Sequence, residues 1–134
     1  MSTLNVNTLA DSNGTGNINV QSEGGSVTTN LQQGLCKCWI KYDGESSGAP
    51  EYDSFNSSST TDNGTGDYTF TITNDMASAN YSHPIVPADA DGGGGLDISV
   101  TSKAAGSIRV GTIRDNSTKT DNANVSVSIF GDLA

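Results

Sequence analysis

The sequence predicts an all-β protein: an antiparallel, jelly-roll-like β-sandwich preceded by a short N-terminal β-strand arm. Two observations support this fold class. Apolar residues alternate with polar ones over short segments, and clusters of Asn, Asp and Gly separate these segments. Helix signals are nearly absent, because the best candidate, 74–80, lasts barely two turns and lacks a sustained apolar face.

Residues 1–34 are predicted to form the arm. They contain no aromatic residue, and their strands are broken at DSNGTG and at EGG. The aliphatic residues that alternate with Asn, Ser and Thr are Leu4, Val6, Ile18, Val20 and Val27. Such an arm lacks the bulk to fold independently, so we expect it to pair with a partner protein or with sister subunits.

Residues 35–134 are predicted to form the sandwich. In the first segment, Cys36, Cys38, Ile40 and Tyr42 share one side of a strand, and Lys37, Trp39 and Lys41 share the other. The clearest later segments are 107–114 and 123–130, which alternate in the same way. Strands are expected at 36–42, 52–58, 66–73, 80–86, 96–102, 107–114 and 123–130.

Composition narrows the function classes. Leu, Ile, Val and Phe together make up about 19% of the 134 residues and the net charge is −9, which places the chain at the edge of the composition typical of disorder. A thin sandwich, or an oligomer whose subunits complete one another's core, suits so polar a chain. Six cations against fifteen acids argue against nucleic-acid binding. We find no signal peptide and no run of transmembrane length, and therefore expect assembly in a cytosol without membrane insertion.

The order of several short motifs carries a resemblance. WIKYDG stands at 39–44, DSFN at 53–56, TDNGTGDYT at 61–69 and NY at 80–81. This order resembles the small β-rich tip domain of bacteriophage tail-fibre proteins, common in phages of aquatic bacteria. The opening STLNVNTLADSNGTGNI is similar to N-terminal segments of small phage fibre-like proteins, where such strands pack onto a virion partner or onto sister subunits.

The resemblance implies a virion protein, assembled in the host cytoplasm as a homotrimer. Its arm would attach to another virion protein, and its sandwich would mediate attachment to a host-surface polysaccharide. The alternative is a capsid or tail decoration protein that serves assembly or stability without receptor binding. A glycan-degrading depolymerase is the least favoured of the three.

Catalytic signatures are weak, and we expect no enzyme. The single histidine, His83, has no nucleophile motif beside it, so a structural or surface role is favoured. Candidate glycan contacts are Tyr52, Tyr81 and His83. Trp39 between Lys37 and Lys41 would suit stacking on a sugar ring, although a lone Trp is more often buried in a core or interface.

The segment 87–99, PADADGGGGLDIS, is the best candidate for a metal site. Asp89, Asp91 and Asp97 flank four glycines that could wrap calcium, although the spacing of an EF-hand is not met. A flexible surface loop is the favoured interpretation, with Asp89 and Asp91 as receptor contacts. Cys36 and Cys38 supply half of a zinc site, and small buried thiols are favoured instead. We therefore expect no cofactor.

Overall fold

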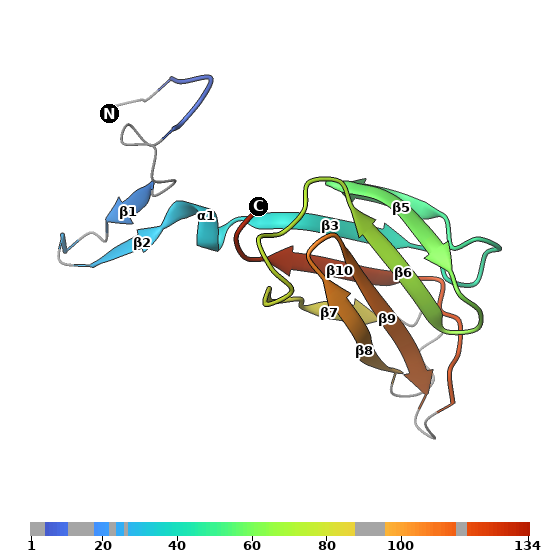
Figure 1. The fold of residues 1–134 in the computed structure, drawn as a ribbon. Coiled ribbons are helices and arrows are strands. Elements are labelled where there is room, and N and C mark those ends of the chain that lie inside the picture. Colours follow the sequence, from blue (N-terminus) through green and yellow to red (C-terminus); the bar gives the residue numbers. More distant parts are fainter. Residues whose placement is uncertain (1–4, 11–17, 22–23, 26, 88–95, 115–117) are drawn as a thin grey trace. The chain divides into compact units, whose positions relative to one another are not determined.

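The computed structural model describes residues 5–10, 18–21, 24–25, 27–87, 96–114 and 118–134. The chain divides into two compact units, Met1–Leu35 and Cys36–Ala134, a boundary one residue from the expected one. Figure 1 shows the strands of each unit. The expected all-β class is confirmed.

The described residues of the first unit include a small hairpin and one helical turn. Strands β1 (Asn19–Gln21) and β2 (Thr28–Asn30) pair antiparallel, and α1 (Leu31–Gly34) follows directly. Asn30 starts the turn because its side-chain oxygen accepts a hydrogen bond from the Gln32 amide at 2.8 Å. The expected helical candidate, 74–80, is not helical.

The second unit is a sandwich of two four-stranded antiparallel sheets, ordered β4-β3-β10-β7 and β5-β6-β9-β8. The hairpins β3–β4, β5–β6 and β8–β9 lie within sheets, and the other connections cross between them. This order confirms a sandwich but does not confirm a jelly roll. The strands are β3 (Cys36–Tyr42), β4 (Glu51–Phe55), β5 (Ser57–Asp62), β6 (Asp67–Ile72), β7 (Ile85–Pro87), β8 (Leu96–Ala104), β9 (Ser107–Arg114) and β10 (Val125–Phe130).

The core lies between the two sheets and comes from one chain. Alternate residues of β3, β6, β9 and β10 point inward, as the period-2 patterns predict. The buried apolar residues are Cys38, Ile40, Tyr42, Ala49, Tyr68, Phe70, Ile72, Met76, Tyr81, Ile108, Val110, Val125, Val127 and Ile129. The sandwich therefore does not need a second subunit to complete this core.

The expected strand 52–58 is in fact two strands in different sheets. Asn56 separates β4 from β5 with a φ of 59°, a conformation that asparagine tolerates better than most residues. Its amide nitrogen donates to the carbonyls of Lys37 and Asn74 at 2.9 and 3.2 Å, and its oxygen accepts from the Asn74 amide at 2.8 Å. Asn56 thus fixes the corner where the chain changes sheets. The expected strand 80–86 is also shorter, since β7 is confined to Ile85–Pro87.

The two cysteines are free, and Cys38 is fully buried in the core as expected. Burial, followed by repulsion from Cys36 and Glu51, raises the pKa of the Cys38 thiol to about 12. Cys38 therefore stays protonated at neutral pH. Within the described ranges, the structure shows no group of three His, Cys, Asp or Glu residues that could hold a metal ion.

Candidate binding face

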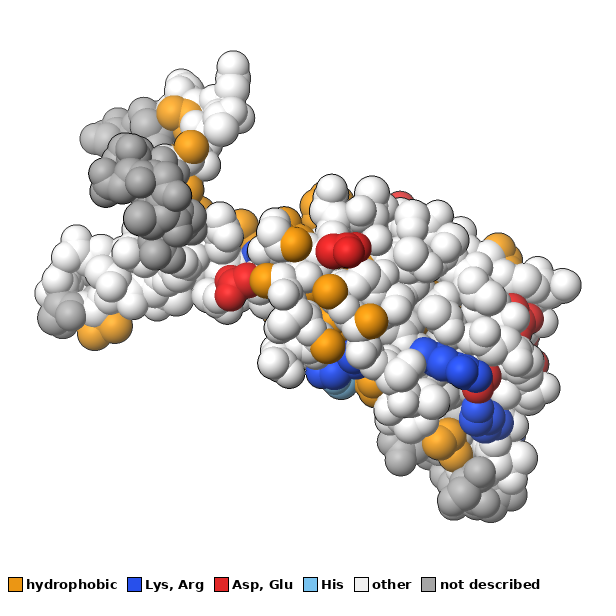
Figure 2. All heavy atoms as spheres, viewed as in Figure 1, with side chains coloured by type: hydrophobic (Ala, Val, Ile, Leu, Met, Phe, Trp, Pro, Cys, Tyr) orange, Lys and Arg blue, Asp and Glu red, His pale blue; other side chains and the backbone are white. Residues whose placement is uncertain are grey.

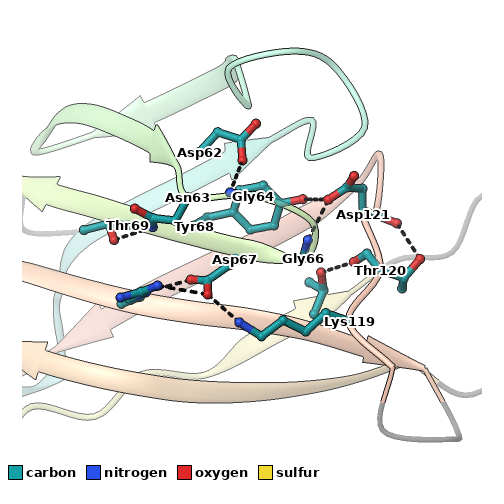
Figure 3. A network of polar contacts seen from close by, with 12 residues as sticks. Asp62, Asn63, Gly64, Gly66, Asp67, Tyr68, Thr69, Lys119, Thr120 and Asp121 are labelled. Carbon is teal, nitrogen blue, oxygen red and sulfur yellow. Dashed lines mark hydrogen bonds and ion pairs between the residues drawn. The ribbon is translucent and has the colours of Figure 1, made fainter.

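A network of polar contacts joins three loops at one end of the sandwich (Figure 3). Oδ1 of Asp121 accepts hydrogen bonds from the Gly66 amide and from the Tyr68 hydroxyl, each at 2.6 Å. The same hydroxyl lies 2.9 Å from the carbonyl oxygen of Gly44. We call Gly44, Gly66, Tyr68 and Asp121 the turn network. The motifs YDG and TDNGTGDYT therefore meet here, where their polar groups hold the β3–β4, β5–β6 and β9–β10 connections together.

A cluster of charges lies beside the turn network, with Asp67 on β6, Arg109 on β9 and Lys119 in the β9–β10 connection. Asp67 accepts hydrogen bonds from Arg109 Nε at 2.7 Å and Nη2 at 3.0 Å, and it forms an ion pair with Lys119. The Asp67 side chain is buried, whereas both cations are partly exposed. Hydrogen bonding to Arg109 and then to Lys119 outweighs the cost of burial and lowers the pKa of Asp67 to about 2.

The depressed pKa predicts how stability depends on pH. Ionised Asp67 stabilises the fold above its unfolded pKa of 3.8, and this contribution is lost as the pH falls toward about 2. We expect Asp67→Asn to lower the free energy of unfolding at pH 7 by about 1 kcal/mol, a value reduced for the solvent exposure of the cations. Urea unfolding at pH 7, 4 and 2 measures the difference.

The difference between wild type and Asp67→Asn should shrink between pH 4 and pH 2, because wild-type Asp67 becomes protonated there. Asp53→Asn, at an exposed position of β4, is the matched control and should change stability little at any of these values. If the difference in stability between wild type and Asp67→Asn were the same at pH 7, 4 and 2, the lowered pKa of Asp67 would be contradicted.

The outer face of the β4-β3-β10-β7 sheet carries exposed aromatic rings. Ile40 and Tyr42 point into the core, so Trp39 and Lys41 lie on the opposite side of β3. Phe55 of β4 is the register partner of Trp39, and it is 54% exposed. Tyr52 is 55% exposed, and its ring centroid lies 5.5 Å from Lys41 Nζ. We call Trp39, Lys41, Tyr52 and Phe55 the aromatic face.

The neighbouring strand borders the aromatic face with small hydroxyl side chains. Ser128 of β10 is opposite Trp39 in the register, and Ser126 is opposite Lys41. Their side chains are much smaller than the rings on β3 and β4, so the rings form a ridge beside a strip of hydroxyl groups. Partial burial and a hydrogen bond to Asp43 raise the pKa of Tyr52, which keeps its hydroxyl protonated.

The outer face of the other sheet has a different character. Figure 2 shows few hydrophobic or charged side chains over β5, β6 and β9, with basic side chains beside an acidic one in one area and a second basic area next to the histidine. The register places Thr61, Thr69 and Arg109 side by side across this sheet. Aromatic residues of β6 face the core instead. The two outer faces of the sandwich thus differ in the ligands they could accept.

The structure does not gather the predicted site residues into one cluster. Tyr52 lies on the aromatic face, but Tyr81 is only 4% exposed, and its hydroxyl donates to the Ser107 carbonyl at 2.8 Å. Because the Tyr81 ring packs in the core, it is too buried to contact a glycan at the surface. His83 is half-buried with its ring centroid 6.4 Å from that of Tyr81.

The structure does not test the acidic residues of segment 87–99 that were predicted as receptor contacts or calcium ligands. Asp89 and Asp91 lie outside the described residues, and of Asp97 the structure describes only its place in β8. Sequence reasoning missed Phe55, whose signal would have been its position in a strand that pairs with the Trp39 strand. It also expected Lys37 to flank Trp39 at the surface, but Lys37 is buried at 7% exposure.

Comparisons with known proteins return no match among protein-family models, curated proteins or solved structures. None of the helices in the described part of the chain has the length and apolar character needed to cross a membrane.

Proposed function

We propose that the protein is a non-enzymatic binding module of a bacteriophage virion, and that its aromatic face contacts a glycan on the host surface. The observation that carries this proposal is the pair of rings, Tyr52 and Phe55, each more than half exposed on one face of a sheet. Exposed apolar groups gathered on one face favour an interaction surface. The motif resemblance to tail-fibre tip domains supports the choice of partner.

The chemistry of the aromatic face suits a sugar. One face of a pyranose ring presents C–H groups that pack on an aromatic ring, while its hydroxyl groups need polar partners at the rim. Phe55 and Tyr52 offer the rings, and Lys41, Ser126 and Ser128 offer hydrogen-bonding groups beside them. The carboxylates of Asp67 and Asp121 are both engaged with internal hydrogen-bond partners, which supports a non-catalytic role.

We also propose that the first unit attaches the module to another virion protein. The same unit would pair with its copies in sister subunits to form a homotrimer. Val20, Val27 and Leu35 are each more than half exposed, and the described residues of this unit carry no ionisable side chain. Free strand edges with uncharged, apolar neighbours favour pairing with another chain. Since the sandwich completes its own core, any trimer would depend on this unit or on outer surfaces.

A glycan array that includes bacterial surface polysaccharides tests the adhesion proposal, with affinities of the hits measured by calorimetry. We expect Phe55→Ala and Tyr52→Ala each to weaken binding by about 1 kcal/mol, or roughly fivefold, because each removes one stacking surface. Tyr52→Phe keeps the ring and should bind nearly as well as wild type. Thr61→Ala, on the outer face of the other sheet, is the matched control.

The same rings could instead form a contact between virion subunits, which is the decoration alternative. Particles reconstituted with Phe55→Ala distinguish the two functions. Loss of incorporation into particles, with no glycan bound by wild type, would overturn adhesion and favour decoration. Glycan binding that survives loss of both rings would place the binding surface elsewhere on the chain.

A further inference from the structure

We propose that Asn63–Gly64 in the β5–β6 turn is a latent deamidation site, and that Thr69 holds it unreactive in the folded protein. The turn belongs to the sheet opposite the aromatic face, so its chemistry is separate from the proposed glycan contact. Both residues are exposed, and the space around the Gly64 α-carbon is open, since a Cβ built there would meet nothing within 4 Å. Water and base therefore reach the peptide bond that would react.

The reaction needs no partner other than water. The backbone nitrogen of Gly64 attacks Cγ of Asn63 and gives up its proton, the side-chain nitrogen leaves as ammonia, and a five-membered succinimide forms. Water then opens the succinimide at one of its two carbonyls, which leaves aspartate or isoaspartate at position 63. Glycine in the second position favours the step because no side chain hinders the attacking nitrogen.

The folded turn restrains both reacting groups, as Figure 3 shows. The amide nitrogen of the Asn63 side chain donates to Thr69 Oγ1 at 2.8 Å, which fixes the electrophilic carbon on β6. The Gly64 amide donates to Asp62 Oδ1 at 2.9 Å, and a carboxylate acceptor stabilises the N–H over the amide anion that would attack. The main chain is held as well, because the Asn63 amide donates to the Asp67 carbonyl at 2.8 Å.

Conversion of Asn63 to aspartate or isoaspartate would affect the neighbouring turn network. A new carboxylate would stand beside Asp62, adding like charge to the turn. Isoaspartate would also add one methylene to the main chain between Asp62 and Tyr68, which are register partners at the end of β5–β6. The added length would disturb the register that places Gly66 and Tyr68 against Asp121. Deamidation is therefore expected to loosen this end of the sandwich.

The test is to age the full chain in mildly alkaline buffer and to measure deamidation of the 63–64 peptide by mass spectrometry after digestion at acidic pH. The wild type in denaturant gives the unrestrained rate, and we expect the folded protein to react more slowly. Thr69→Val removes the hydroxyl but keeps the branched shape, and should raise the folded rate roughly fivefold, the effect of losing one hydrogen bond.

Two control variants and a check of folding make the result decisive. Thr69→Ser restores the hydroxyl and should return the rate toward that of wild type. Thr61→Val, the same change at the register partner on β5, should leave the rate unchanged. Circular dichroism at the ageing temperature checks that each variant is folded. Equal rates for folded and denatured wild type, or equal rates for Thr69→Val and Thr61→Val, would overturn the proposal.

Discussion

Replacing Gly66 by alanine is expected to destabilise the sandwich by roughly 3 kcal/mol or more, since overpacking and backbone strain act together. A Cβ at this position would lie 2.6 Å from the Thr112 carbonyl oxygen and 2.7 Å from the Thr120 amide nitrogen. Both are backbone atoms in paired segments, so neither can move without breaking hydrogen bonds. Gly66 also has a φ of 59°, which disfavours any residue with a side chain.

Gly48→Ala is the matched control, because it shares the positive φ but not the crowding. Its φ is 80°, and a Cβ there would meet nothing within 4 Å. We expect a cost of about 1 kcal/mol from the left-handed backbone alone. Chemical denaturation of both variants measures the difference. Equal losses in the two variants would show that crowding against Thr112 and Thr120 contributes nothing, and the close packing of these loops would be refuted.

Tyr68→Phe is expected to lower the free energy of unfolding by about 2 kcal/mol. The lost Tyr68 hydroxyl bonds to the Asp121 carboxylate, and the site is buried, so water is poorly placed to replace it. The hydroxyl donates to Asp121 Oδ1 and lies near the Gly44 carbonyl, so its removal releases two loops from β6. Burial and then the hydrogen bond to Asp121 raise the pKa of Tyr68, which keeps this donor protonated.

Tyr42→Phe should not destabilise the protein in this way, although the rings of Tyr42 and Tyr68 pack together with centroids 4.9 Å apart. The Tyr42 hydroxyl is buried and finds no hydrogen-bond partner among the described residues. Removing it should leave stability unchanged or raise it by about 1 kcal/mol, because an unpaired buried polar group costs free energy. Thermal and urea unfolding of the two variants test this contrast. A loss from Tyr42→Phe as large as that from Tyr68→Phe would contradict it.

Local alternation accounts for the parts of the fold that the sequence predicted well. Strands β3 and β9 have the expected bounds, and the core positions on β3, β6, β9 and β10 follow the period of two. This pattern can be recognised in the sequence because most of the buried apolar residues on these strands have a polar residue beside them in the chain. The strand expected at 52–58 failed because alternation continues through Asn56, while the change of sheet depends on partners at Lys37 and Asn74.

The candidate site was less predictable than the fold. Tyr52 was singled out from its residue type alone, and the structure places it beside Lys41 on an exposed face. Tyr81 was singled out on the same basis, but it lies in the core. Residue type could not separate the two, because tyrosine suits both a buried position with a bonded hydroxyl and a partly exposed one. Phe55 joined the site only through its register with Trp39.

The sequence alone therefore determined the strand character of most segments and the division between an arm without aromatic residues and a sandwich, since these depend on near neighbours. Only the tertiary structure decided which side chains meet. Tyr68 and Asp121 are 53 residues apart in the chain, and Asp67 and Lys119 are 52 apart. Such contacts are fixed by how two sheets stack and which strands cross between them. That arrangement is a property of the whole folded unit, and no local pattern encodes it.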